Sequence, residues 1–253
     1  MDDTTVIECA ENETPITDVS FGRVYWDGLC LENALFRNCR FTQANFAETN
    51  FEGACFENCT FKNCSFTRGN LQSAEFLDCV FFDGDSGTGA NFTYAHMQGA
   101  RFKRCNLSTS SFRSTILFGA LFEDCTAQGT NFENATFSNS VGGSSRLSNT
   151  DITLHKSNFD YADFQGLSFE GCKITDCSLR ESQLRGCDFK NTDMTGTNIS
   201  GAETDKANFE GTDLRAANVG GLQLSTLSNF RAMKISSDQQ QVLLAGLNIQ
   251  VFP

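Results

Sequence analysis

The chain has 253 residues, of which 40% are hydrophobic and 20% are charged, and its formal net charge is −12. This length suits one large domain or two modest ones with an apolar core, and no apolar run reaches the about 18 residues that a membrane span needs. The start of the chain lacks a basic stretch followed by an apolar one, so we expect no signal peptide, a cytoplasmic location and reduced thiols.

The first predicted segment, residues 1–20, is strongly acidic. Six Asp and Glu residues precede the first basic residue, Arg23. An acidic surface repels nucleic acid and attracts basic partners, although it also serves plain solubility. The sequence leaves open whether this segment caps the next element or hangs free.

From Phe21 onward, a period of five residues dominates the chain. In residues 44–66, ANFAETNFEGACFENCTFKNCSF, phenylalanine occupies every fifth position. A helix repeats near 3.6 residues and a strand at 2, so neither explains this period. Two residues before each large apolar residue, which we call the centre, stands a small residue such as Ala or Cys. An extended pair with both side chains inward, followed by a turn, predicts a solenoid whose rings stack along its axis.

The period is interrupted twice, and each interruption predicts a loop that leaves the solenoid. The loops are residues 82–91 and 138–149, and both are rich in small polar residues. Centres are expected to resume at Phe92 and at Ile152, with two extra residues at 153–158. We expect the first loop to be flexible and both loops to lack residues that could pack; they are either tolerated insertions or recognition loops on a rigid scaffold. The candidate partner-binding residues are Asp83, Asp85, Ser86, Val141 and Arg146.

The tail, residues 228–253, loses the period and predicts a short helix and a strand. Ser236 or Ser237 can cap the helix and Gly246 can end it, after which residues 247–252 alternate like a strand. Because the open end of a solenoid must be covered or paired, we expect a two-fold homodimer through this tail. The expected interface residues are Val242, Leu243, Leu244, Leu247, Ile249 and Val251.

The sequence offers little for catalysis or cofactor binding. His96 and His155 are the only histidines, and neither has a recurring Ser or Cys partner. Nine of the twelve cysteines occupy the small position, and Cys39, Cys59 and Cys79 are spaced 20 apart. A metal or disulfide ladder is one interpretation, but Ala, Thr, Ser and Gly fill the same position elsewhere, which favours simple packing. We therefore expect no enzyme, no cofactor and no metal.

The five-residue unit A-(N/D)-(L/F)-x-x resembles that of the pentapeptide repeat proteins over residues 21–224. Its clearest copies are ANFAE (44–48), ACFEN (54–58), ANFTY (90–94), ADFQG (162–166) and ANFEG (207–211). The resemblance implies an all-β fold, a right-handed quadrilateral β-helix with four units per coil and about ten coils. The expected domains are an acidic segment (1–20), the β-helix (21–227) and a C-terminal helix and strand (228–253).

A closer resemblance is to the Qnr quinolone-resistance proteins. CVFFDGDSGTGANF (79–92) is similar to their first loop, and DQQQVLLAGLNIQV (238–251) to their C-terminal dimerisation helix and strand. Residues 102–114 and 125–137 resemble the coils after the first loop, whereas residues 138–149 match a second loop in place but not in sequence. The N-terminal end is longer than in typical members by about six units.

This resemblance implies binding to the type II topoisomerases, DNA gyrase and topoisomerase IV, and their protection from quinolones or similar poisons. It implies a homodimeric acidic rod that mimics duplex DNA in charge and does not itself bind nucleic acid. The alternative is a structural or adaptor β-helix with an unrelated partner.

Overall fold

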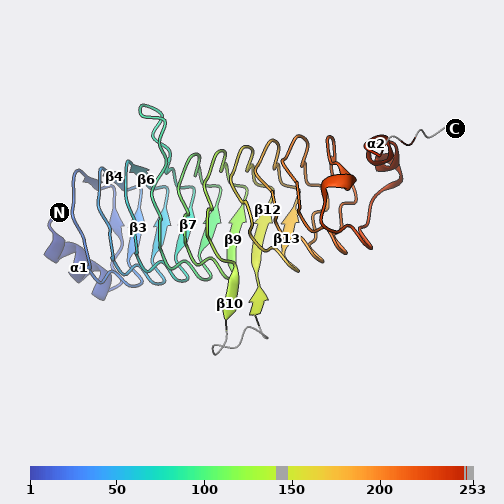
Figure 1. Cartoon of the computed structure of the whole chain (residues 1–253). Helices are drawn as coiled ribbons and strands as arrows, with labels where there is room; N and C mark the ends of the chain where they lie inside the picture. Colours follow the sequence, from blue (N-terminus) through green and yellow to red (C-terminus); the bar gives the residue numbers. More distant parts are fainter. Residues whose placement is uncertain (141–147, 248, 250–253) are drawn as a thin grey trace.

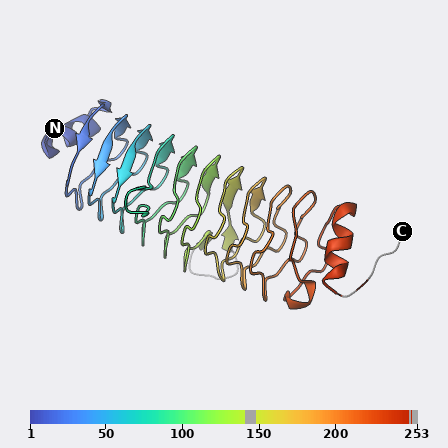
Figure 2. The ribbon, with the colours of Figure 1, turned by 90° about the horizontal axis from the view of Figure 1, so that it is seen from above.

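A computed structural model describes residues 1–140, 148–247 and 249. The chain winds into a right-handed four-sided β-helix, an elongated rod with helix α1 (Asp3–Glu11) at one end and helix α2 (Gln240–Ala245) at the other (Figure 1). Seen from above, the coils follow one another along the rod (Figure 2). The solenoid that the five-residue period predicted is confirmed.

One side of the rod, which we call face A, carries a parallel sheet of eight short strands. The strands are β1 (Ile16–Thr17), β3 (Leu35–Arg37), β5 (Cys55–Glu57), β7 (Glu75–Leu77), β8 (Arg101–Lys103), β9 (Ala120–Glu123), β12 (Ile152–His155) and β13 (Lys173–Thr175). Their register pairs centre with centre, as where Phe56 lies between Phe36 and Phe76. Bridges then extend face A beyond β13 as far as Lys234.

The other three sides complete each coil. Face B holds a three-stranded parallel sheet of β2 (Ser20–Phe21), β4 (Arg40–Thr42) and β6 (Thr60–Lys62). Faces C and D come next along the chain. On each of them, isolated β-bridges link one coil to the next, beginning with Tyr25↔Asn45 on face C and Cys30↔Asn50 on face D. These partners are 20 residues apart, so four five-residue units make one coil.

The core is a set of stacked aromatic columns. The rings of Phe36 and Phe56 are 5.0 Å apart between centroids and nearly parallel, as are those of Phe56 and Phe76 at 4.9 Å. Neighbouring columns meet edge to face, as between Phe56 and Phe61 at 5.4 Å and 74°. Both geometries suit the quadrupole of the ring. Each fully buried ring adds about 1.5–3 kcal/mol of burial free energy, which explains the strict selection of the centre.

The corners between faces require a special backbone conformation. The second residue after a centre often adopts a positive φ, such as 54° at Asn38 and 65° at Gly53. Glycine, Asn and Asp tolerate this left-handed conformation better than other residues. The same corner position nevertheless holds Arg68 and Tyr94, at φ of 57° and 62°, so the four-sided coil imposes the conformation on bulky residues too.

The solenoid begins and ends further out than the sequence predicted. Ile16 is buried and pairs with Phe36, so the first coil starts within the segment 1–20 that was expected to precede it. At the other end, Asn229 and Lys234 still bridge to the previous coil, so the β-helix passes the expected boundary at residue 227. Both boundaries were missed because the end units replace the usual phenylalanine by Ile or lengthen the spacing.

The acidic N-terminus caps the first coil, which settles the alternative that the sequence left open. Helix α1 (Asp3–Glu11) starts at the N-cap Asp2, whose side chain accepts a hydrogen bond from the backbone N–H of Thr5. Val6 is buried against the core, and the indole Nε1 of Trp26 donates to Asp3 at 2.8 Å. Because the helix covers the open end, the first coil does not offer a free edge for aggregation.

The second interruption is a single insertion of twelve residues. Leu154 pairs with Phe122 of the previous coil, and Ile152 pairs with Ala120. Leu154 is therefore the centre, and Ile152 fills the small position that precedes it. The expected centre at Ile152 and the two extra residues at 153–158 were wrong. Ile152 and Leu154 both point inward and both are apolar, so the five-residue period fits a centre at either position.

The C-terminal segment closes the other end of the rod. It contains the short helices η1 (Leu224–Thr226), η2 (Ser237–Gln239) and α2 (Gln240–Ala245). Ser236 and Gln239 form a reciprocal capping box, and the buried Nε2 of Gln239 donates to the carbonyl oxygens of Leu214 and Ala217. The helix ends before Gly246, as predicted. Within the described residues, no helix has the length and apolar character needed to cross a membrane.

Candidate functional site: two loops and the two ends of the rod

Two loops project from opposite sides of the rod (Figure 1). Residues 82–91 leave the corner between faces B and C, where Asn91 bridges to Ser65. The second loop leaves the corner between faces D and A as an antiparallel hairpin of β10 (Ser138–Ser140) and β11 (Ser148–Thr150). The two interruptions therefore occupy diagonally opposite corners, and one flat partner surface cannot meet both.

The first loop is held by a buried carboxylate, which corrects the expectation that it lacks packing residues. Asp83 is only 5% exposed. It accepts hydrogen bonds from Asn63 Nδ2 at 2.7 Å and Ser86 Oγ at 3.0 Å, and from the backbone N–H of Asp85 at 3.2 Å. The ammonium group of Lys62 lies 3.4 Å from the same carboxylate. The signal in the sequence was the Asp-x-Asp-Ser spacing, which is typical of an Asx turn.

The three candidate residues of this loop thus differ in accessibility. Asp83 faces inward, and the hydroxyl of Ser86 is engaged with Asn63 and Thr88. Only Asp85 displays its carboxylate, with 92% of the side chain exposed. A partner at this loop would contact Asp85 and the loop backbone, whereas Asp83 sets the shape of the loop.

We predict that Asp83→Ala releases the loop without unfolding the rod. At neutral pH, cleavage within residues 82–91 by a broad-specificity protease should be faster than in the wild type. Asp85→Ala serves as the control, because an exposed ion pair contributes little, and should be cleaved at the wild-type rate. Equal cleavage of the two variants would show that Asp83 does not hold the loop.

The same contact predicts a dependence on pH. Burial raises the pKa of Asp83, but hydrogen bonds from Ser86, the backbone of Asp85 and Asn63 outweigh burial and lower it overall. Its contribution to loop stability is therefore present above the unfolded value, about 3.9, and is lost as pH falls through the lower folded value. Hydrogen exchange at the N–H of Gly87, which donates to the carbonyl of Asp83, should lose protection only in that acidic range.

The tip of the second loop lies outside the described residues, and with it the candidates Val141 and Arg146. The hairpin base is described, with Ser138 opposite Thr150. The backbone N–H of Asp151 then donates to the carbonyl of Phe137 at 2.9 Å. This contact closes the hairpin where it leaves the rod, so the insertion does not disturb the next coil.

The C-terminal end exposes apolar side chains, as expected of an interface. Val242 is 48% exposed, Leu247 37% and Ile249 49%, and Leu244 is half-buried. Leu243, however, is only 2% exposed, because it packs on its own solenoid, and its assignment to the dimer interface was wrong. Val251 lies outside the described residues.

Phe230 adds to this apolar end, and sequence reasoning missed it. It is 44% exposed and takes the centre position of the last coil, since the adjacent Asn229 bridges to Asn208. Six residues instead of five separate it from Leu224, which hid it from the period.

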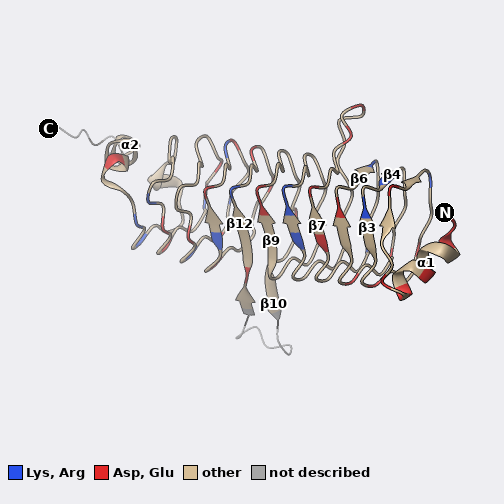
Figure 3. Ribbon diagram, turned by 180° about the vertical axis from the view of Figure 1, so that it is seen from behind, with Lys and Arg blue, Asp and Glu red and all other residues tan. Residues whose placement is uncertain are grey.

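Negative charge is concentrated at the N-terminal end of the rod. Residues 1–33 contain eight acidic residues and one basic residue, a net charge of −7 out of −12, and acidic positions mark α1 (Figure 3). Further along, ion pairs between neighbouring coils offset many of the acidic groups. Examples are Arg37–Glu57, Arg101–Glu75, Lys103–Glu123, Arg104–Asp78, Arg113–Glu133 and Lys190–Glu170.

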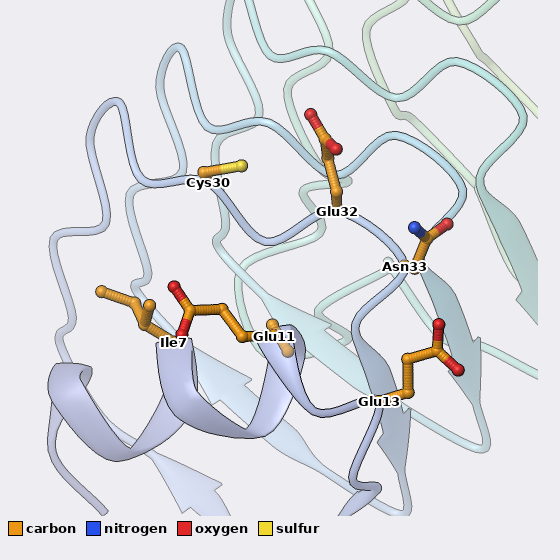
Figure 4. A pocket seen from close by; sticks show the side chains of 7 residues that line it. Ile7, Glu11, Glu13, Cys30, Glu32 and Asn33 are labelled. Atoms are coloured by element: carbon orange, nitrogen blue, oxygen red, sulfur yellow. The ribbon is translucent and has the colours of Figure 1, made fainter.

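A pocket of about 340 Å³ opens between α1 and the first coil. Glu11 lines it from the end of the helix and Glu13 from the segment that follows, and Cys30 and Glu32 line it from face D of the first coil (Figure 4). Ile7 adds an apolar wall. The acidic end of the rod is thus hollowed, and its carboxylates surround the opening.

The buried cysteines act as hydrogen-bond donors within the solenoid. Cys79 Sγ lies 3.3 Å from the carbonyl oxygen of Phe56, one coil earlier. In the same column, the hydroxyl of Thr197 makes the equivalent bond to Ile174 at 2.5 Å. Burial raises the pKa of the thiol of Cys187 to about 12. These contacts support the packing interpretation, and they add a selection for donors that small size alone did not reveal.

The remaining polar candidates form no recognisable catalytic group. His96 is exposed on face D, and His155 Nδ1 lies 2.8 Å from the hydroxyl of Thr175 on β13. In the part of the chain that the structure describes, no cluster of three or more His, Cys, Asp or Glu residues suits a metal ion.

Comparisons with known proteins give a consistent result. A model of the pentapeptide repeat region matches residues 31–112, 54–132, 145–219 and 162–236, and a model of eight pentapeptide repeats matches residues 115–153. No curated protein sequence matches the chain.

Among solved structures, the plasmid-mediated fluoroquinolone resistance protein QnrB1 is similar over nearly its whole length. A trypsin-treated variant of it is 26% identical, with a TM-score of 0.71 over 94% of this chain and 99% of that chain. Full-length QnrB1 is 25% identical, with a TM-score of 0.70 over 91% and 100%. HetL, a pentapeptide repeat protein involved in the regulation of heterocyst differentiation in the cyanobacterium Nostoc, is 15% identical with a TM-score of 0.53 over 87% of this chain and 86% of that chain, which shows a shared fold.

Proposed function

Since the chain belongs to the pentapeptide repeat family and is a Qnr-like member of it, we propose that it binds DNA gyrase and topoisomerase IV and protects them from quinolones or similar poisons. The observation that carries the proposal is the likeness to QnrB1, which leaves only a few per cent of either chain unmatched. The protein would act in the cytoplasm by binding alone, as a non-enzyme without a cofactor.

The negative charge of the rod supports a DNA-like contact with the enzyme. This charge is concentrated at one end of the rod and is not spread along its whole length, as the overall composition suggested. A surface that holds DNA is cationic and binds phosphate arrays largely by charge. The matching acidic surface here is the N-terminal end, where residues 1–33 carry −7. We propose that this end docks on the DNA-binding surface of the topoisomerase, while the loops reach the region where the drug stabilises cleaved DNA.

The apolar C-terminal end supports a homodimer, in which two rods join tail to tail. The acidic ends would then lie at the two extremes of the dimer, as two copies of one binding surface. The interface would be centred on the exposed side chains of Val242, Leu247 and Ile249. Burying such groups is the main source of affinity in an interface of this kind.

We predict that Val242→Asp converts the dimer to a monomer, because a charge within an apolar interface must be desolvated. Light scattering on the purified protein measures the mass directly. The control is Val80→Asp, which places the same charge at a 37% exposed valine on face B and should leave a dimer. A monomeric wild type, or a dimeric Val242→Asp variant, would contradict the interface.

The topoisomerase proposal is tested by direct binding. Wild-type protein should bind gyrase and topoisomerase IV, and its affinity should fall between about 0.05 and 0.2 M salt, as charge-driven contacts do. A structural adaptor with an unrelated partner would bind neither enzyme at any salt concentration.

A further inference from the structure

Faces C and D contain a stretch without carboxylates in an otherwise acidic protein. Between Glu52 and Glu133, every acidic residue belongs to face A, to the corner after it, or to the first loop. These residues are Glu57, Glu75, Asp78, Asp83, Asp85, Glu123 and Asp124. The two loops leave the rod at the outer edges of this pair of faces, so a partner that meets both loops must curve around faces C and D and passes over the stretch.

This stretch presents cationic, aromatic and aliphatic side chains at the corner between faces C and D. We call the group formed by Arg68, Tyr94, His96, Ile116 and Phe118 the ridge. The first four of these residues line a shallow pocket of about 390 Å³. Phe118 is half-buried on face D and lines a second hollow with Asn149 and Thr150 at the base of the hairpin. Asp151 and Glu170 line the far side of that hollow, so the stretch without carboxylates ends there. The ridge is therefore continuous with the second loop.

The geometry of Arg68 leaves its charge available. Its guanidinium carbon lies 5.7 Å from the centroid of the Tyr94 ring, which is 52% exposed. Among the described residues, Arg68 takes part in no ion pair. Stacking on an aromatic face fixes the plane of a guanidinium group. Its N–H donors stay free to form a bidentate pair of hydrogen bonds with a carboxylate.

The composition of the ridge is that of an interface centre rather than of a solvated surface. Tyr and Arg are the residues that most often dominate binding energy, and apolar neighbours such as Ile116 exclude water around them. A cationic DNA-binding surface would repel Arg68. The group that fits is an anionic one with an apolar neighbour.

We infer that the ridge is a second docking surface, which binds a segment of the topoisomerase that carries a carboxylate beside an apolar side chain. This inference rests on the proposed function and adds to it a contact of opposite sign. The acidic end meets a cationic surface of the enzyme, and the ridge meets an anionic one. Opposed contacts of this kind fix the orientation of a rod, because reversing it brings like charges together.

The test uses substitutions that the same corner already accepts elsewhere. The double variant Arg68→Glu/Tyr94→Asn introduces the residues found at equivalent corners at Glu48 and Asn134, all with positive φ. The matched control is Arg180→Glu/Tyr161→Asn on face B and its corner, where Tyr161 is 56% exposed and has a φ of 62°. Both variants change the net charge equally and should keep the wild-type melting temperature.

Binding of wild type and both variants to gyrase is measured in one series. The ridge variant should lose about tenfold or more in affinity, as expected for a stacked Arg and Tyr at an interface centre, whereas the control should stay within about twofold. Equal affinity of the ridge variant and the wild type would overturn the inference while the proposed function stands. An equal loss in both variants would also overturn it, since general charge would then explain the effect. A wild type that binds neither topoisomerase would refute the proposed function, and the ridge inference with it.

Discussion

Excision of residues 138–149 is expected to abolish protection of gyrase while leaving the rod folded. The deletion joins Phe137 to Thr150 and Asp151, which restores two corner residues before Ile152. The coil then regains the 20-residue repeat found in the first part of the rod. The hydrogen bond from Gly119 N–H to the carbonyl of Asp151 can persist. Loops on a rigid scaffold tolerate removal when the backbone contacts at their base survive.

Protection is measured as the supercoiling activity that gyrase retains in a quinolone, and folding as circular dichroism and thermal unfolding. The comparison variant lacks residues 83–88, which likewise restores the spacing between Phe81 and Phe92. It should lose less protection, because most polar groups of that loop are bonded within the rod and only Asp85 is offered to a partner. Full protection by a folded 138–149 deletion would remove the second loop from the mechanism.

The second large effect concerns the core. Phe102→Ala should destabilise the rod by about 3–5 kcal/mol, the usual cost of truncating a fully buried ring to Ala. Phe102 stacks between Phe76 and Phe122 at 4.8 and 4.9 Å, and its side chain has 0% exposure. The parallel coils on both sides are tied to its backbone, so they cannot collapse into the cavity without breaking the ladder.

The free energy of unfolding is obtained from urea denaturation of both variants and the wild type. The control is Phe118→Ala, in which a half-buried phenylalanine on the outside of face D is removed at a cost of about 1 kcal/mol or less. Similar losses for the two variants would contradict the view that the stacked columns stabilise the fold.

The period of five was enough to predict the core because the constraint is local and strict. Each centre, such as Phe46 or Phe51, occupies the same environment as the centre one coil away, so a single rule recurs along the chain. The cysteines were correctly grouped with the small residues, since size was the stronger requirement. Their hydrogen bonds to carbonyl oxygens depend on the next coil, and a sequence pattern does not show that distance.

The parts that the sequence predicted poorly depend on contacts without a period. Asp83 was expected in a flexible loop, yet it is fixed by Asn63, a corner residue one coil earlier. Ile152 and Leu154 are both apolar, so by sequence alone either could be the centre, and Ile152 was chosen. Only the pairing of Leu154 with Phe122 of the previous coil shows that Leu154 is the centre. Phe230 escaped notice because the last coil is one residue longer.

The candidate binding surfaces were also predicted only in part, because their position depends on how the coils stack. Composition predicted an acidic protein, but only the coil geometry separates the ion-paired face A from the acidic N-terminal end and from the ridge without carboxylates. The candidate caps Ser236 and Ser237 and the terminator Gly246 predicted the C-terminal helix, whereas the burial of Leu243 depends on how that helix packs against the last coil.

Protection of a topoisomerase is measured with a gyrase supercoiling assay in the presence of a quinolone. With increasing amounts of this protein, supercoiling should recover at low concentration and be inhibited only at high concentration, where the acidic ends compete with DNA. If supercoiling does not recover at any concentration and the protein binds neither gyrase nor topoisomerase IV, it does not protect these enzymes and is a pentapeptide repeat rod with a different partner.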